Sequence, residues 1–198
     1  MDKRKVNGAE LLNLSAQIGK SLVENGAEIY RVEESVSFLL RAYGMEDSAV
    51  FAIPSFLLIT LGGADGQALT KGVRILWHTT DLYRLDRLNA LCRWACEERP
   101  DLPVLAERLR LLEARKGYPF AARLAACGLV GGSFAAFFGG GWRDALCAAA
   151  AGVVTGLVCR WMDRLRANRF FRNLAAGMLA SFTVLLLAWL GLGVHTDA

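Results

Sequence analysis

The sequence lacks the motifs of the common enzyme classes. It contains no P-loop, no Gly-x-Ser-x-Gly elbow and no His-Glu-x-x-His zinc motif. Its two histidines, His78 and His195, stand apart from each other and from any cysteine at ligand spacing, so both are interpreted as bystanders. No catalytic residue, metal site or cofactor is predicted, and these absences point away from an enzyme.

Paired cysteines and a secretory signal are also missing. The five cysteines form no Cys-x-x-Cys pair. Cys92 and Cys96 are four residues apart and share one helix face. All five are interpreted as small apolar side chains of a reduced compartment. The basic start leads into an amphipathic segment and not into an apolar signal core, so the first half of the chain is expected to remain in the cytoplasm.

Long stretches of the second half lack charge. Ala145 to Cys159 and Leu174 to Val194 carry none, and residues 120–140 carry only Arg123. A helix rises about 1.5 Å per residue, and the hydrocarbon core of a membrane is about 30 Å thick. Membrane-spanning helices are therefore predicted over 120–140, 142–161 and 174–194, the second with tryptophans as interfacial ends. The alternative is a helical bundle buried inside a soluble protein.

Positive charge is concentrated between the last two of these stretches. Residues 1–116 hold 16 basic and 16 acidic side chains, so the net charge of +4 belongs to residues 117–198. Five arginines lie within residues 160–172: Arg160, Arg164, Arg166, Arg169 and Arg172. A nucleic-acid partner is not predicted, because its binding surface would place basic residues on the folded first domain. By the positive-inside rule, these arginines set the topology and lie in the cytoplasm, on the same side as residues 1–116.

Residues 1–116 predict an α+β domain, and residues 117–198 an all-α transmembrane domain. Apolar periodicity predicts a helical hairpin over 9–25 and 27–42. β-Rich runs then predict a three-stranded antiparallel meander at 50–53, 56–61 and 68–77. Two further helices are expected, the first capped by Thr79, Thr80 or Asp81 and ending near residue 98, and the second covering about 102–116.

Small residues mark packing faces on the predicted spanning helices. Gly128 and Gly132 are four apart on the first, and Gly152 and Gly156 are four apart on the second. This spacing lets two helices approach closely in lipid, although a segment rich in glycine and alanine also produces it by chance. Asp144 opens the second helix, where a carboxylate is stabilised by the exposed amides; capping alone would explain it.

Two polar constellations stand out in the first domain. Residues 26–34 place Glu28, Arg31 and Glu34 along one helix face, and residues 81–89 alternate in sign. Either is explained by a solvated face with ion pairs three or four residues apart. Either would also serve a binding function.

The whole chain resembles the threonine/serine exporter family of bacterial inner-membrane transporters. The residues that carry the resemblance follow one another in order: Gly26-Ala27-Glu28, Arg31-Val32-Glu33-Glu34, Pro54, Arg74, Leu85, Asn89, Gly139-Gly140-Gly141-Trp142 and Asp144. The resemblance implies export of threonine and serine, or of a dicarboxylate such as succinate. It makes Glu28, Arg31, Glu33, Arg74, Asn89 and Asp144 candidates for the substrate path.

The resemblance also implies partners. Besides the lipid bilayer and a small-molecule substrate, a second, shorter membrane subunit or another copy of the chain is expected. Such longer subunits typically carry about five spanning helices, so the chain is expected to be truncated. A membrane-anchored cytoplasmic enzyme or sensor, with helices that only tether it, is the alternative. The arginines of residues 160–172 are expected to lie near the first domain, or near the mouth where an anionic or zwitterionic substrate enters.

Overall fold

A computed structural model describes residues 7–62, 67–115, 117–165 and 168–192, and for Arg169 the backbone alone. The chain divides into two compact units, Met1–Arg115 and Lys116–Ala198. Each unit is described by itself.

The first unit begins with the helical hairpin that the apolar periodicity predicts. It consists of α1 (Gly8–Glu24) and α2 (Ile29–Ala42). Between them Gly26 adopts a left-handed φ of +96°, and a Cβ atom there would lie 3.1 Å from the carbonyl oxygen of Thr79. Both the conformation and the close approach favour glycine. Glu28 is still extended, so α2 begins two residues later than the pattern predicts.

The predicted antiparallel meander is confirmed. Among the described residues, β1 (Ser48–Ile53), β2 (Phe56–Leu61) and β3 (Leu69–Arg74) form a three-stranded sheet in the order β1-β2-β3. Arg74 pairs with Phe56, the first residue of β2. The expected extension of the third strand to residue 77 is wrong, because β2 offers no further residue to pair with it.

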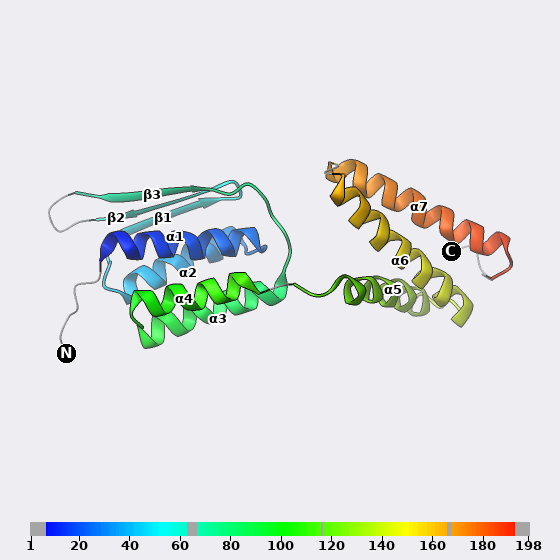
Figure 1. Ribbon diagram of the computed structural model, residues 1–198, viewed down its shortest axis with the longest axis horizontal. Helices are drawn as coiled ribbons and strands as arrows, with labels where there is room; N and C mark the ends of the chain where they lie inside the picture. Colours follow the sequence, from blue (N-terminus) through cyan, green and yellow to red (C-terminus); the bar gives the residue numbers. More distant parts are fainter. Residues whose placement is uncertain (1–6, 63–66, 116, 166–167, 193–198) are drawn as a thin grey trace. The chain divides into compact units, whose positions relative to one another are not determined.

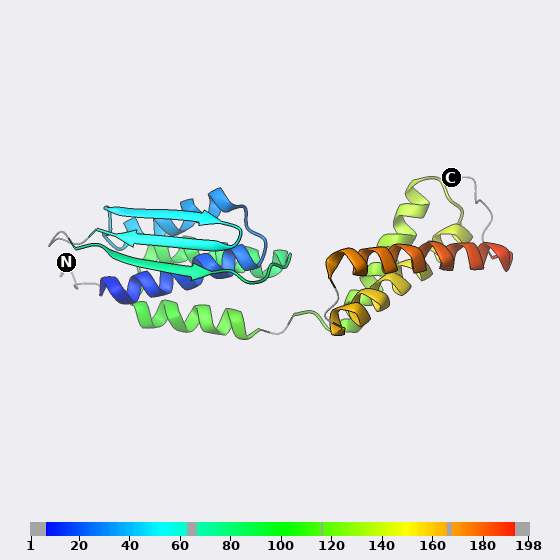
Figure 2. The same ribbon diagram turned by 90° about the horizontal axis from the view of Figure 1, so that it is seen from above.

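Two more helices complete the first unit, α3 (Leu82–Glu98) and α4 (Leu102–Ala114). The predicted cap of α3 is Asp81, whose carboxylate accepts a hydrogen bond from the Arg84 amide at 3.0 Å. Within the described residues the unit stacks in layers, with α1 and α2 between the sheet and the α3–α4 pair (Figure 1, Figure 2). One continuous core fills the space between the layers and includes Leu11, Ile18 and Leu57.

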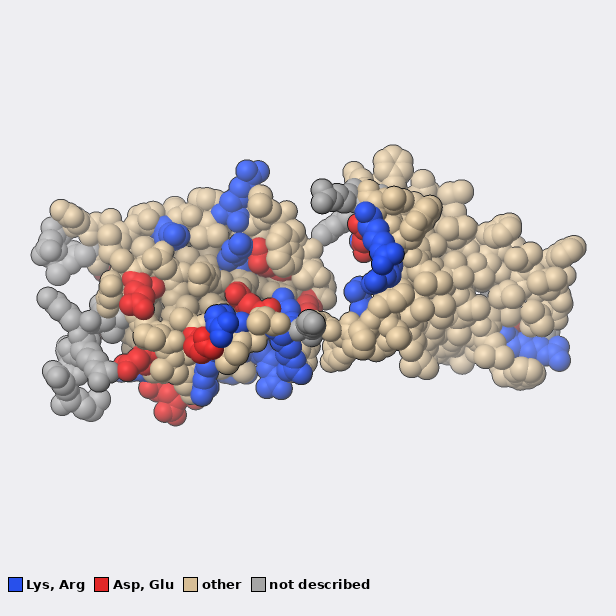
Figure 3. Space-filling view, viewed as in Figure 1, with Lys and Arg blue, Asp and Glu red and all other residues tan. Residues whose placement is uncertain are grey.

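The second unit consists of helices in its described part: α5 (Phe120–Phe137), α6 (Trp142–Arg164) and α7 (Arg169–Trp189). All three are long and apolar enough to cross a membrane. Their large apolar side chains face outward; Phe137 and Trp189, for example, are each 82% exposed. On the face shown in Figure 3, charged atoms gather at the ends of this unit and the surface between them is uncharged. The soluble-bundle alternative would require these side chains to be buried, so the outward faces favour membrane-spanning helices.

Helices extend into the stretch of arginines, residues 160–172, from both sides. Helix α6 continues to Arg164, and α7 already begins at Arg169 and ends at Trp189, so the expected bounds of 142–161 and 174–194 are wrong. Arginine is a good helix former. The end of an apolar run therefore does not mark the end of the helix.

Candidate functional site

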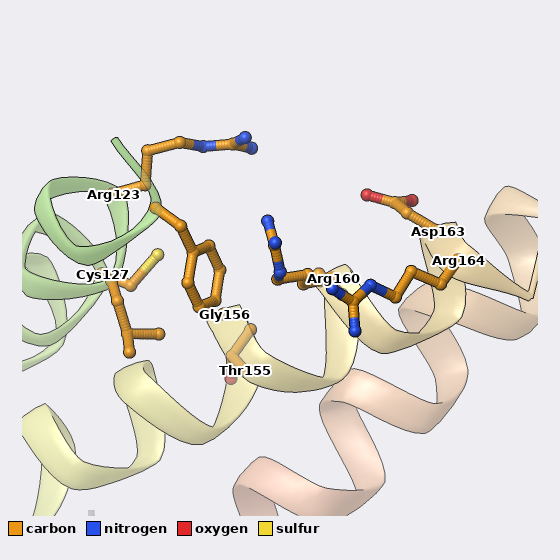
Figure 4. A pocket seen from close by; sticks show the side chains of 10 residues that line it. Arg123, Cys127, Thr155, Gly156, Arg160, Asp163 and Arg164 are labelled. Carbon is orange, nitrogen blue, oxygen red and sulfur yellow. The ribbon is translucent and has the colours of Figure 1, made fainter. Parts of the chain in front are cut away.

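A pocket of about 400 Å³ lies between α5 and α6, where α5 begins and α6 ends. We call it the arginine pocket (Figure 4). Its lining comes from both helices: Phe120, Arg123, Leu124 and Cys127 of α5, and Thr155, Gly156, Cys159, Arg160, Asp163 and Arg164 of α6.

The charge of the arginine pocket is predominantly positive. Arg123 from α5 and Arg160 from α6 extend toward the same space, and Arg164 follows one turn after Arg160 (Figure 4). The Arg160 guanidinium lies 4.2 Å from the centre of the Phe120 ring, which supports it from one side. Asp163 is the acidic residue in this lining, and it forms a 3.0 Å ion pair with Arg172 of α7.

Such a lining suits a carboxylate. A guanidinium presents planar, paired N–H donors that match the two oxygens of a carboxylate, and the apolar surroundings strengthen the attraction. The wall that carries Phe120, Leu124 and Cys127 is apolar, so a small hydrocarbon backbone fits beside the charged groups. The arrangement can therefore bind a small anion or zwitterion.

Glycines bring the two helices of the pocket together. A Cβ atom at Gly156 would lie 2.9 Å from Leu124 Cδ1, and one at Gly132 would lie 3.0 Å from the carbonyl oxygen of Ala145. Gly128 and Gly152 also face the partner helix, as the sequence predicts for all four glycines. The structure adds Gly131, where a Cβ atom would collide with the Ala148 carbonyl. Its signal in the sequence is the Gly131-Gly132 pair.

In the first unit, Glu28, Arg31 and Asn89 line a second pocket, of about 250 Å³. Arg31 Nε lies 3.0 Å from both Glu28 Oε2 and the Tyr30 hydroxyl. That hydroxyl, and after it the Glu28 carboxylate, raise the pKa of Arg31. More than half of both charged side chains is exposed, so the ion pair itself is the solvated one that the simpler interpretation predicts.

The remaining substrate-path candidates lie elsewhere. Glu33 Oε1 accepts a hydrogen bond from the Ala52 amide at 2.7 Å and so joins α2 to β1. Arg74 is exposed at the end of β3. Asp144 accepts from the Gly141 amide at 2.9 Å and caps α6 at the end remote from the arginine pocket. Within the first unit, Glu33 and Arg74 therefore do not line the pocket that Glu28, Arg31 and Asn89 share.

The arginines that are expected to set the topology also lie in different surroundings. Arg160 and Arg164 line the arginine pocket, and Arg172 pairs with Asp163. Arg166 and the Arg169 side chain lie outside the described residues. Arg123 and Asp163 also line the arginine pocket, and neither is among the site residues predicted from the sequence. The signal for Asp163 is its position one turn after Arg160 on the same helix.

Comparisons with known proteins find a matching family and a relative. A family model described as "Putative threonine/serine exporter" matches residues 13–198. A protein named "Threonine/serine exporter" from Corynebacterium glutamicum is 23% identical over 177 residues, which are 87% of this chain and 36% of that protein. The chain therefore spans about a third of the length of this relative. No solved structure matches.

Proposed function

The chain belongs to the threonine/serine exporter family, and from this premise we propose that it is a subunit of a secondary exporter of small polar metabolites in the bacterial inner membrane. Its cargo is threonine or serine, or a dicarboxylate such as succinate. The arginine pocket carries this proposal, because it places cationic side chains of two candidate spanning helices around one cavity.

In this proposal the cargo carboxylate binds Arg123 and Arg160. These arginines come from different helices, so the site exists only while α5 and α6 are packed together. Charged side chains at membrane depth are costly and usually mark a substrate path. For an amino-acid cargo, Asp163 is the acceptor for the ammonium group. For a dicarboxylate, Arg164 provides a further cation.

The proposed orientation places the first unit in the cytoplasm. Arg123 near the start of α5 and Arg160 near the end of α6 line one pocket, so both basic ends lie on one side of the second unit. The positive-inside rule assigns that side to the cytoplasm. The arginine pocket is then the inner mouth of the path. A second, shorter membrane subunit or another copy of the chain supplies the rest of the path.

Efflux measurements test this function. Cells that lack the gene are loaded with threonine, serine or succinate, and release is compared with and without expression of the protein. We expect faster release of at least one compound, and a loss of about tenfold or more for Arg160→Gln and Arg123→Gln, since each removes a charged hydrogen bond to the cargo. Arg143→Gln is the matched control, because Arg143 lies at the opposite end of α6 beside Trp142.

The Asp163→Asn variant distinguishes an amino-acid cargo from succinate. This change weakens efflux of an amino acid and leaves efflux of succinate intact, because only the amino acid has an ammonium group to place there. Equal release of all three compounds with and without the protein contradicts the exporter. Full efflux by the Arg160→Gln and Arg123→Gln variants contradicts the arginine pocket as its path.

A further inference from the structure

A third pocket lies inside the first unit, among α1, α3 and α4, and has a volume of about 330 Å³. We call it the Glu24 pocket. Its lining includes Lys20, Glu24, Asn25, Trp77, Arg84 and Glu113. Acidic and basic groups therefore surround one small cavity, unlike the predominantly cationic arginine pocket.

One wall of the Glu24 pocket contains buried hydrogen-bond acceptors. Glu24 is 7% exposed and Asn25 is 2% exposed. The Asn25 side-chain amide donates to the Ser21 carbonyl at 2.7 Å, but within the described residues its Oδ1 accepts from no donor. Glu24 Oε1 likewise has no hydrogen-bond partner there, but it forms an ion pair with Lys20, whose Nζ lies 3.6 Å away. Buried acceptors are rarely left unpaired, so this wall suits a ligand that brings N–H donors.

Arg84 of α3 also lines this pocket. One of its N–H groups donates to the Arg115 carbonyl at 2.8 Å, which fixes the guanidinium at the edge of the pocket. A guanidinium has five N–H donors, so this bond leaves others for a ligand carboxylate. Glu113 on α4 is already engaged, because it accepts a hydrogen bond from the Ser21 hydroxyl.

The segment that leads from β3 to α3 contributes Trp77 to the lining. Its backbone is joined to the end of α1 by hydrogen bonds from the Thr79 amide to the Glu24 carbonyl at 2.8 Å and from the Asp81 amide to the Asn25 carbonyl at 3.3 Å. These bonds anchor the segment that carries Trp77. The small volume lies at the lower end of the roughly 300–1,000 Å³ that ligand pockets occupy. Large ligands are therefore excluded.

We propose that the Glu24 pocket binds a small α-amino acid, with the ammonium group at Glu24 and Asn25 and the carboxylate at Arg84. The site lies within the first unit and uses no residue of the arginine pocket. It goes beyond the proposed export function and does not rest on it, since ligand binding is measured without transport.

Calorimetric titration of the purified full chain tests this site. The probes are L-serine, succinate, which lacks the ammonium group, and ethanolamine, which lacks the carboxylate. We expect serine to bind more tightly than either. Glu24→Gln and Arg84→Gln each weaken serine binding by about tenfold or more, because each removes a charged hydrogen bond. Glu107→Gln is the matched control, since Glu107 is exposed on α4 and pairs with Arg110 outside the pocket.

Separate outcomes would overturn the proposal. Serine that fails to bind, or that binds the Arg84→Gln variant as tightly as the unchanged chain, excludes the site. Arg84 is only half-buried, so this second variant remains informative if Glu24→Gln does not fold. Serine binding that disappears in Arg160→Gln but persists in Glu24→Gln would assign the ligand to the arginine pocket instead. Succinate that binds as tightly as serine contradicts the zwitterion.

Discussion

At the scale of single residues, burial decides the chemistry of Cys92. Its thiol lies in the core of the first unit, whereas Cys96, one turn later on α3, is only half-buried. Burial raises the pKa of the Cys92 thiol to about 12, with a smaller contribution from Cys96. The neutral thiol is thus the form that the folded chain favours. This agrees with the interpretation of the cysteine as a small apolar side chain.

Cys92 is expected to react more slowly with iodoacetamide than Cys96 at pH 8, by about tenfold or more, because only an exposed thiolate is a good nucleophile. Mass spectrometry of the alkylated peptides measures both sites in one sample. Folding raises the Cys92 pKa above its ordinary value of 9.0, so the stability gained is fully present below pH 9 and is lost as the pH rises toward 12. Equal rates at the two sites would contradict the buried, neutral thiol.

Glu33 and Asp144 show how a polar residue of a motif acquires a structural role. Glu33 bonds the Ala52 amide on β1, and Asp144 caps its own helix. Capping is a local pattern and is readable from sequence. The Glu33 bond joins α2 to a strand that comes later in the chain, and only the packed structure reveals it.

At the scale of elements, the contact between α5 and α6 depends on residues without side chains. At Gly152 an added Cβ atom would collide with the carbonyl of Cys127, and at Gly131 with that of Ala148. The obstacles are backbone atoms of the partner helix, which cannot rotate away. The two helices therefore cannot keep this distance once either glycine is replaced.

Gly152→Leu is expected to destabilise the second unit by about 1–3 kcal/mol, the usual range for overpacking. Thermal unfolding of the purified protein in detergent measures the change. Gly177→Leu on α7 is the control, because a Cβ atom there would meet nothing within 4 Å. The same substitution then differs only in its surroundings. Equal stability of the two variants would show that the α5–α6 contact does not depend on Gly152.

For the molecule as a whole, the arginines at the end of α6 and the start of α7 are expected to set the orientation of the chain in the membrane. Each basic residue near the inner membrane surface contributes about 1 kcal/mol of attraction to anionic lipid. Arg160 and Arg164 lie in the last turns of α6, and α7 begins at Arg169. Their positions in helices leave the charge argument unchanged, since it depends on depth in the membrane and not on helical conformation.

Replacing Arg160, Arg164, Arg166, Arg169 and Arg172 by glutamine is expected to produce mixed orientations. A phosphatase reporter is fused after Gly140, in the turn between α5 and α6. In the unchanged protein the reporter should lie on the outer side of the membrane and be active. In the variant it should be several-fold less active. Arg143→Gln, at the other end of α6, should leave the reporter unchanged. Full activity in the five-fold variant would mean that other features set the topology.

Features that depend on local patterns could be predicted from the order of the amino acids alone. Hydrophobic periodicity and uncharged runs predicted the helical hairpin, the antiparallel meander and the three apolar helices that the structure contains. The predicted helix ends in the arginine stretch differ from the observed ones. Hydropathy shows where an apolar run stops, but α6 continues past that point to Arg164 and α7 begins before the next apolar run, at Arg169. The family, too, was readable from ordered motifs along the chain.

The packing of helices in three dimensions determines which distant side chains meet. Arg123 and Arg160 share a pocket because glycines let α5 approach α6. Glu24 and Arg84 share another because α1 packs between the sheet and the α3–α4 pair. Charge and spacing along the chain carry no information about such pairs. Their proximity follows from how whole helices pack, and that packing places the charges that the two proposed binding sites use.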